Sequence, residues 1–248
     1  MLDREKLRAQ MEALENGGRP VIKSAMWKPE NGEQYIRLLP DSNGNPFGVY
    51  HFHFGLKSSP SGIICPKRQF NNDCPICEFA SQAWRAGDPA SQELAKRLFA
   101  KVRYFTKIVV RDKDGNNLTE PKIWGFGKTA YKSLLTVSLD PDYGDVTDVD
   151  SGRDFKLVYT KSDKKGVLPT TQLTVRPKET PLAPTPGEVA DLLENIPEFD
   201  SLDLFNVLSS SQLKDMLTES FDVAEPEPWQ DDSVESRADA VIAEVTNR

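Results

Sequence analysis

The soft metal ligands of this chain are concentrated in one short stretch. All three cysteines and both histidines of the 248 residues fall between positions 51 and 77. They read His51-Phe52-His53, then Cys65, then Cys74-Pro75-Ile76-Cys77. The Cys-x-x-Cys turn offers two thiolates, Cys65 offers a third, and either His51 or His53 offers an imidazole. Three thiolates and one imidazole fill the tetrahedral shell of zinc and leave no position for water, so we predict one structural Zn2+.

Two other interpretations of the cysteines are weaker. Free cysteines often serve as small core residues, but the polar stretch after Cys65 and the clustering of the ligands favour a metal. A disulfide framework conflicts with the odd number of cysteines, with the length of the chain and with an N-terminus that does not resemble a signal peptide.

Composition bounds the class of protein. Hydrophobic residues make up 38% of the chain, which is enough for a core, and no run of 18 apolar residues could span a membrane. We therefore expect a soluble cytoplasmic protein that is not secreted and does not contact membranes. Residues 1–170 carry 26 basic and 21 acidic side chains, whereas residues 171–248 carry 5 and 17. Such an acidic end either competes with a polyanion and recruits partners, or merely aids solubility.

The chain divides into an arm, a body and a tail. An apolar stripe at helical spacing in residues 1–20 ends at Gly17-Gly18, so this segment is predicted to be a helical arm that packs on its own domain or on a second copy. Residues 21–222 form the core domain. Residues 223–248 are acidic and polar, and we expect them to form a mobile tail.

The core domain shows many short strands and few helices. We predict strands over residues 35–39, 48–54, 101–111, 121–126, 155–161 and 170–176. Helices are expected over 78–86, 90–99, 128–139 and within 187–221. This pattern favours the α+β class, with an OB-fold-like small β-barrel, an inserted zinc subdomain at about residues 50–100, and additional helices.

The hairpin expected at residues 101–128 interleaves cations with aromatic rings. The segment 101–132 holds eight basic and three acidic residues. By strand parity, one face of the first strand carries Arg103, Phe105, Lys107 and Arg111, and one face of the second carries Lys122, Trp124, Phe126 and Lys128. Single-stranded nucleic acid is bound by this combination, because cations meet phosphates and rings stack on bases.

Aromatic residues on strands are usually core and alternating lysines are usually solvated. A face that mixes rings with cations is not expected to be buried, however, and this favours nucleic-acid binding. The candidate contacts are Lys101, Arg103, Tyr104, Phe105, Lys107, Arg111, Lys122, Trp124, Phe126, Lys128, Tyr131 and Lys132. Of these, Tyr104 has the opposite parity from its neighbours.

None of the enzyme motifs that the sequence partly resembles is complete. The stretch from Gly125 to Thr129 ends like a phosphate-binding loop, but Lys122 stands where the first glycine is required. The His-x-Glu and Pro-Cys-x-x-Cys signature of zinc deaminases is absent, and no histidine remains for a catalytic triad. We therefore predict that the chain is not an enzyme. A zinc-dependent nuclease with an open metal position is a minor alternative.

The motifs, taken in order, resemble the replicative single-stranded DNA-binding, or helix-destabilising, proteins of T-even-type bacteriophages. The resemblance is carried by EKLRAQMEALENG, by YIRLLPDSNGNPFGVYHFHFGLK, by Cys65 followed by CPIC, by KVRYFTKIVV and KIWGFGK, and by the acidic C-terminus.

This resemblance implies an oligonucleotide-binding fold with a zinc subdomain that coats single strands cooperatively and without sequence preference. It implies roles in phage DNA replication, recombination and repair in the cytoplasm of the infected bacterial host. The arm would contact a neighbouring copy, and the tail would contact replication and recombination proteins. The implied zinc ligands are His53, Cys65, Cys74 and Cys77, and the implied cleft residues are Arg103, Tyr104, Phe105, Trp124 and Lys128. The competing hypothesis is a zinc-stabilised adaptor that binds only proteins.

Overall fold

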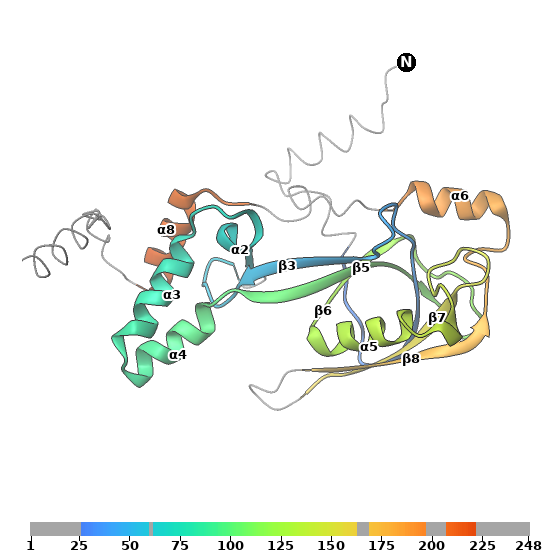
Figure 1. Ribbon diagram of the computed structural model, residues 1–248, viewed down its shortest axis with the longest axis horizontal. Coiled ribbons are helices and arrows are strands. Elements are labelled where there is room, and N and C mark those ends of the chain that lie inside the picture. The colour runs from blue at the N-terminus through green and yellow to red at the C-terminus, as the bar shows by residue number, and fades with distance from the viewer. Residues whose placement is uncertain (1–25, 60–61, 163–168, 197–206, 222–248) are drawn as a thin grey trace, which may run out of the picture.

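The computed structural model describes residues 26–59, 62–162, 169–196 and 207–221, which form two lobes joined by a long two-stranded ribbon (Figure 1). The β-rich lobe lies at the right of Figure 1 and the helical lobe at the left. The predicted arm and tail lie outside the described residues. Among the helices of the described residues, none has the length and apolar character needed to cross a bilayer.

The strands are β1 (Met26–Trp27), β2 (Gly32–Leu38), β3 (Phe47–His53), β4 (Ile63–Ile64), β5 (Lys101–Arg111), β6 (Lys122–Phe126), β7 (Arg153–Thr160) and β8 (Thr170–Glu179). The helices are α2 (Pro66–Phe70), α3 (Pro75–Ala86), α4 (Pro89–Leu98), α5 (Lys128–Ser138), α6 (Pro186–Glu194) and α8 (Ser210–Phe221), with a 3-10 turn η2 (Pro141–Tyr143). The predicted strand over 101–111 has the bounds of β5. The short elements β1, β4 and α2 were not predicted, because two to five residues show no periodicity.

Strand β5 runs through the ribbon and continues as a central strand of the β-rich lobe. One of its edges pairs with β6, and the other pairs first with β3 and then with β2. Leu38 of β2 opposes Ile108, and Phe47 of β3 opposes Thr106, so only Lys107 separates the two pairings. Strands β2 and β3 therefore act as one long partner of β5, interrupted by a loop at residues 39–46.

Lys107 holds this loop in place. Its Nζ donates to Asp41 Oδ2 at 2.9 Å, and its carbonyl oxygen accepts from the backbone N–H of Leu39 at 2.9 Å. Both side chains of the ion pair are largely buried. The chain can thus leave β5 after β2, and β3 resumes the pairing only one residue further along β5.

The main core lies between the sheet and α5. Strands follow the order β1-β6-β5-β2-β7-β8, with β3 and β4 attached beside β5. The cluster that fills this lobe includes Ile36, Ile108, Trp124, Leu134 and Phe155. The sheet combined with helices, and a His/Cys3 cluster that could hold zinc in the segment around β3, β4 and α3, confirm the α+β, OB-like architecture expected from the sequence.

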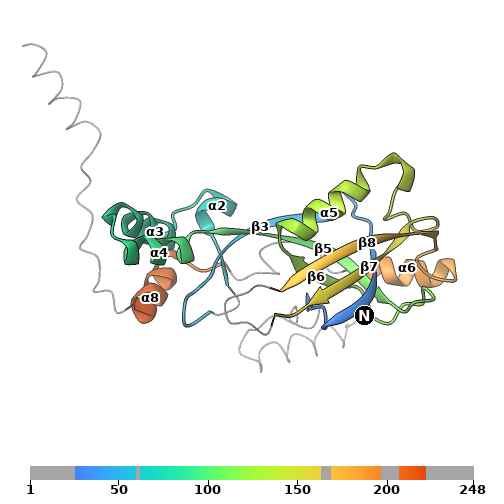
Figure 2. The same ribbon diagram turned by 90° about the horizontal axis from the view of Figure 1, so that it is seen from below.

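The helical lobe, hereafter the metal lobe, combines α2, α3 and α4 with α8 from far along the chain (Figures 1 and 2). Leu213 and Leu217 of α8 share a hydrophobic cluster with Cys65, Cys74 and Ile76. The polypeptide thus returns to the metal lobe after completing the β-rich lobe, and α8 packs directly over the metal ligands.

A buried ion network ties β2, β5 and β7 together. Arg37 Nη1 and Arg111 Nη1 both donate to Asp154 Oδ1, at 3.2 and 2.9 Å. All three side chains are almost fully buried. Burial lowers the pKa of Arg37 to about 10, although the charge of Asp154 opposes this shift. The Nη2 groups of Arg37 and Arg111 also donate to backbone carbonyls, those of Thr180 and Leu182.

We expect Asp154→Asn to lower the free energy of unfolding by about 3–5 kcal/mol, because it leaves two buried guanidinium groups without a counter-charge. Urea denaturation measures this loss. The control is Glu179→Gln, whose partner Arg153 lies 2.9 Å away at an exposed site, where a loss below about 1 kcal/mol is expected. Equal stability of Asp154→Asn and the wild type would contradict a structural role for the network.

Candidate metal centre and nucleic-acid interface

The structure brings four of the predicted metal ligands together. One ligand atom from each of His53, Cys65, Cys74 and Cys77 lies within 4.8 Å of the others. Cys65 Sγ lies 3.4 Å from Cys77 Sγ, and His53 Nε2 lies 3.3 Å from Cys74 Sγ and 3.6 Å from Cys77 Sγ. A tetrahedral zinc ion with bonds of about 2.0–2.3 Å separates its ligand atoms by roughly 3.4–3.8 Å, so this donor set fits zinc.

Local structure prepares each ligand. Cys65 is the N-cap of α2, where its Sγ accepts from the N–H of Arg68 at 3.3 Å. Cys74 is the N-cap of α3, and Cys77 lies in the first turn of that helix. Helix N-termini favour negative charge and therefore thiolates. Because the three cysteines lie at the starts of α2 and α3, their sulfur atoms come together although the sequence around them shows no strong periodicity.

His53 is oriented by a contact outside the ligand set. Its Nδ1 lies 2.7 Å from the carbonyl oxygen of Leu98. Since a carbonyl only accepts, Nδ1 carries the proton and donates, which leaves Nε2 facing the three sulfurs. His51 does not join the cluster, because its Nδ1 lies 3.3 Å from Gln69 Oε1 instead. Of the two histidines that the spacing left open, the ligand is therefore His53.

The close contacts of the cluster shift the pKa values of its side chains. Burial lowers the pKa of His53, but the thiols of Cys65 and Cys74 and the Leu98 carbonyl raise it to about 9. Hydrogen bonds from Cys74 and Cys77 lower the pKa of Cys65, whereas hydrogen bonding to Cys65 raises that of Cys77.

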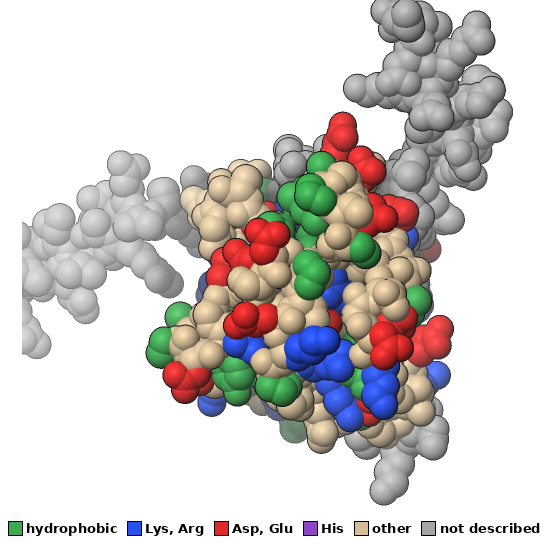
Figure 3. All heavy atoms as spheres, turned by 90° about the vertical axis from the view of Figure 1, so that its right-hand side faces the viewer, with side chains coloured by type: hydrophobic (Ala, Val, Ile, Leu, Met, Phe, Trp, Pro, Cys, Tyr) green, Lys and Arg blue, Asp and Glu red, His purple; other side chains and the backbone are tan. Residues whose placement is uncertain are grey.

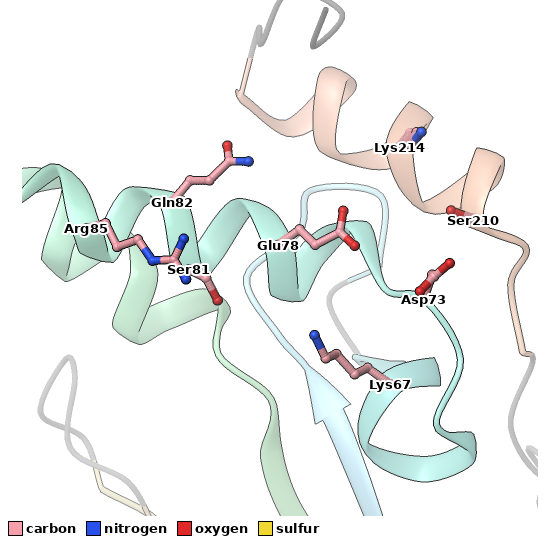
Figure 4. A pocket seen from close by; sticks show the side chains of 8 residues that line it. All are labelled: Lys67, Asp73, Glu78, Ser81, Gln82, Arg85, Ser210 and Lys214. Carbon is pink, nitrogen blue, oxygen red and sulfur yellow. The ribbon is translucent and has the colours of Figure 1, made fainter. Parts of the chain in front are cut away.

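A polar cavity of about 540 Å³ lies between α2, α3 and α8. Figure 4 shows its lining side chains, which are Lys67, Asp73, Glu78, Ser81, Gln82, Arg85, Ser210 and Lys214. No aromatic ring and none of the predicted nucleic-acid residues is among them. The cavity is thus distinct from the basic and aromatic strands.

The two predicted sets of residues, one on β5 and one on β6, lie on opposite faces of the sheet. Tyr104 directly opposes Phe126, and Thr106 opposes Trp124. Directly opposed residues share a face, so Trp124 and Phe126 lie with Tyr104, whereas Arg103 and its alternate neighbours lie on the other face. The prediction that both sets line one trough is wrong, because parity within each strand does not fix the register between strands.

Burial also removes three of the predicted aromatic rings from the surface. Phe105, Trp124 and Phe126 are 4%, 1% and 3% exposed, so their rings belong to the core and offer no free face to a base. Lys107 and Arg111 are buried as well, and each has a carboxylate partner, in Asp41 and Asp154. A buried strand face does tolerate cations when they are neutralised in this way.

The remaining predicted contacts are accessible. Lys101, Lys128 and Lys132 are exposed, and Arg103, Tyr104, Lys122 and Tyr131 are half-buried. Arg103 is partly committed to the fold, since its Nη2 donates to the carbonyl of Gly125 at 3.3 Å and burial lowers its pKa. These residues stay predicted contacts.

The rings of Tyr104 and Tyr131 stack with centroids 3.9 Å apart and planes 14° from parallel. Lys128 and Lys132 lie three residues before and one after Tyr131 on α5, and Val49 opposes Tyr104 on β3. We call these five residues the tyrosine surface. Neither lysine side chain has an ion pair or hydrogen bond within the described part of the chain.

Sequence reasoning missed two features of this surface. Val49 is 41% exposed on a strand, and an exposed valine has no chemical signature in a sequence. The first turn of α5 contains no acidic residue and its N-cap is Gly127, which makes no side-chain cap. A helix start without a side-chain cap favours an anion, and the glycine before Lys128 was the available signal.

Positive charge also gathers at the far end of the β-rich lobe. Figure 3 shows a patch of Lys and Arg side chains there, bordered by Asp and Glu side chains. On β7 two cations are already paired, Lys156 with Glu33 and Arg153 with Glu179. The tyrosine surface, where rings adjoin unpaired lysines, is therefore the stronger candidate.

An OB-like barrel with a Cys3His lobe and a stacked ring pair beside unpaired lysines defines a class of nucleic-acid-binding proteins. Among known families, residues 30–219 match the one described as gp32 DNA binding protein like, and the chain belongs to this family. The resemblance to phage single-stranded DNA-binding proteins is thereby confirmed, and family membership supports binding of single-stranded DNA. No curated protein matches the chain.

We expect the purified wild-type protein to contain one zinc per chain, measured by plasma mass spectrometry. His53→Ala should lose most of this zinc, because it removes one of four donor atoms and leaves a buried gap. The matched control is His51→Ala, which should keep it, since His51 lies outside the cluster. Full zinc content in both variants would contradict the assignment of His53.

Proposed function

We propose that this protein binds single-stranded DNA without sequence preference through the tyrosine surface. Bases stack on the pair formed by Tyr104 and Tyr131, and phosphates contact Lys128 and Lys132. The observation that supports this proposal most directly is the half-buried stacked ring pair beside unpaired lysines, in a chain of a DNA-binding family.

The chemistry of the surface suits any sequence. Every base has a π face, and each stacked base contributes about 1–3 kcal/mol. Lysine ammonium groups act as compact point charges, and a phosphate is present at every nucleotide whatever its base. Phosphate contacts release counterions, so affinity should fall steeply with salt. Protein that prefers single strands then lowers the stability of duplex DNA by mass action.

We also propose that the four-residue cluster holds one zinc ion with a structural role and that the protein is not an enzyme. A complete set of protein donors leaves no coordination position for water. The ion would fix the metal lobe at the end of the ribbon, because His53 is the last residue of β3.

The cellular role extends the resemblance. We propose cooperative coating of single strands in phage DNA replication, recombination and repair, in the cytoplasm of an infected bacterium. The arm at residues 1–20 would contact a neighbouring copy, and the acidic tail at 223–248 would contact replication and recombination proteins. The acidic excess of residues 171–248 supports the second part, since such a segment competes with DNA for basic surfaces.

Tyr131→Ala should weaken binding about five- to 150-fold on every sequence, as expected for one lost stacking contact. Fluorescence anisotropy with labelled oligo-dT, oligo-dA and a mixed-sequence strand measures this. Tyr131→Phe should retain binding, because it keeps the ring. The control is Tyr143→Ala, which removes a half-buried tyrosine that packs on Arg153 outside the surface. A loss confined to one sequence would refute stacking without base readout.

Lys128→Gln and Lys132→Gln should each reduce the slope of log affinity against log salt by about 0.7, the value for one single-strand phosphate contact. The matched control is Lys214→Gln, an exposed lysine that lines the polar cavity. Titrations at four salt concentrations give the slopes. Wild-type slopes in both α5 variants would show that these lysines do not contact phosphate.

A further inference from the structure

One edge of β3 is only partly covered by another strand. Its first edge pairs with β5 from Phe47 to Phe52. On the opposite edge, within the described residues, β4 pairs with Phe52 and His53 alone. An uncovered strand edge presents unpaired N–H and C=O groups. The part of β3 that approaches the tyrosine surface is thus the part that lacks a neighbouring strand on this side.

Helix α2, which lies beside β3 in Figure 1, supplies the missing partners. The N–H of Cys65 donates to the carbonyl of His51 at 2.8 Å. The side chain of Gln69 then accepts from the N–H of His51 through Oε1 at 3.2 Å, and its Nε2 donates to the carbonyl of Val49 at 3.4 Å. One amide group therefore offers β3 a donor and an acceptor, as the peptide groups of a paired strand would.

These partners fix the orientation of the Gln69 amide. A backbone N–H only donates and a carbonyl only accepts, so the amide oxygen faces His51 and the nitrogen faces Val49. The same oxygen lies 3.3 Å from Nδ1 of the His51 ring. The N–H of Gln69 donates to the carbonyl of Cys65 at 3.0 Å within α2. The side chain is thus engaged by β3 and the backbone by the helix.

The residues that Gln69 holds adjoin the two tyrosines. Val49 directly opposes Tyr104 on β5. Phe47 lies two residues earlier on the same face of β3, and its ring packs edge-on against Tyr131, with centroids 5.4 Å apart and planes 81° apart. Phe47 is 7% exposed, so it supports Tyr131 from the core and offers no face of its own to a base. The position of β3 therefore sets the support of both rings.

We propose that Gln69 is a positioning residue for the binding of single-stranded DNA. By holding β3 at Val49 and His51, it keeps Phe47 and Val49 where they support the stacked tyrosines. This inference rests on the proposed function and adds to it a residue of α2 that raises affinity without contacting DNA. A role in stability alone would leave the affinity of the folded protein unchanged.

Gln69→Met should weaken binding of oligo-dT about two- to 12-fold, which corresponds to the net contribution of one hydrogen bond. Methionine keeps the length and helix propensity of glutamine but forms neither bond with β3. The slope of log affinity against log salt should keep its wild-type value, because no phosphate contact is lost. Fluorescence anisotropy measures affinity, and circular dichroism checks that the variant is folded.

The matched control is Gln82→Met, which alters an exposed glutamine that lines the polar cavity and should bind as the wild type does. Wild-type affinity of folded Gln69→Met would overturn the inference.

A double-mutant cycle with Tyr131→Ala tests whether Gln69 acts through the stacked pair. If it does, Gln69→Met should lose most of its effect once the ring of Tyr131 is absent, because the two residues are energetically coupled. If the two effects multiply instead, Gln69 acts independently of the pair and the inference is overturned.

A second measurement uses the unaltered protein, in case Gln69→Met fails to fold. Coupling between two equilibria is reciprocal, so a bond that strengthens DNA binding must open less often when DNA is bound. Exchange of the His51 amide hydrogen, followed by NMR, should therefore slow about two- to 12-fold at saturating oligo-dT. The control is the N–H of Ser91, which also donates to a side chain, Asp88 Oδ1 at 2.8 Å, and should not change. Unchanged exchange at His51 would contradict the positioning role.

Two results would separate the role of Gln69 from the proposed function. If Tyr131→Ala weakens binding while Gln69→Met does not, the proposed function stands and Gln69 has no positioning role. If the wild-type protein does not bind oligo-dT, the proposed function itself fails and the inference falls with it.

Discussion

The hydrogen bond between His53 Nδ1 and the Leu98 carbonyl closes the metal lobe onto the ribbon. It joins the last residue of β3 to the last residue of α4, across 45 positions of sequence. Because β5 starts three residues later, this bond holds the two strands of the ribbon together at their far end. The same imidazole faces three sulfurs through Nε2, so metal ligation and strand pairing depend on one side chain. This hydrogen bond therefore also helps to position the start of β5, which carries Val102 and Tyr104.

The cations of this protein fall into two groups, those that are neutralised by a buried carboxylate and those that are not. Lys107 and Arg111 are buried and neutralised by Asp41 and Asp154, so they fix the loop between β2 and β3 and the junction of three strands. Lys128, one turn from a stacked ring on α5, has no such partner in the described segments and remains available to phosphate. Lys107 and Lys128 are the same residue type, and the carboxylate partner of Lys107 distinguishes this structural lysine from the one proposed to contact phosphate.

The metal ligands and β5 could be predicted because their signals are local. A Cys-x-x-Cys turn and an eleven-residue strand are visible within their own stretch. The face on which Trp124 lies could not be predicted, because it depends on pairing with Thr106 across the sheet. The roles of Lys107 and Arg111 depend on carboxylates 66 and 43 positions away. Such contacts leave no pattern in a single sequence, which is why buried cations were interpreted as a binding face.

Two connections, rather than one, join the lobes. The ribbon carries the chain out from the barrel, and α8 returns to pack Leu213 and Leu217 against the cluster that contains Cys65. Phe221 at the end of α8 stacks on Phe79 of α3, with centroids 5.9 Å apart. The metal lobe is therefore fixed by side-chain packing from α8 as well as by the two strands of the ribbon.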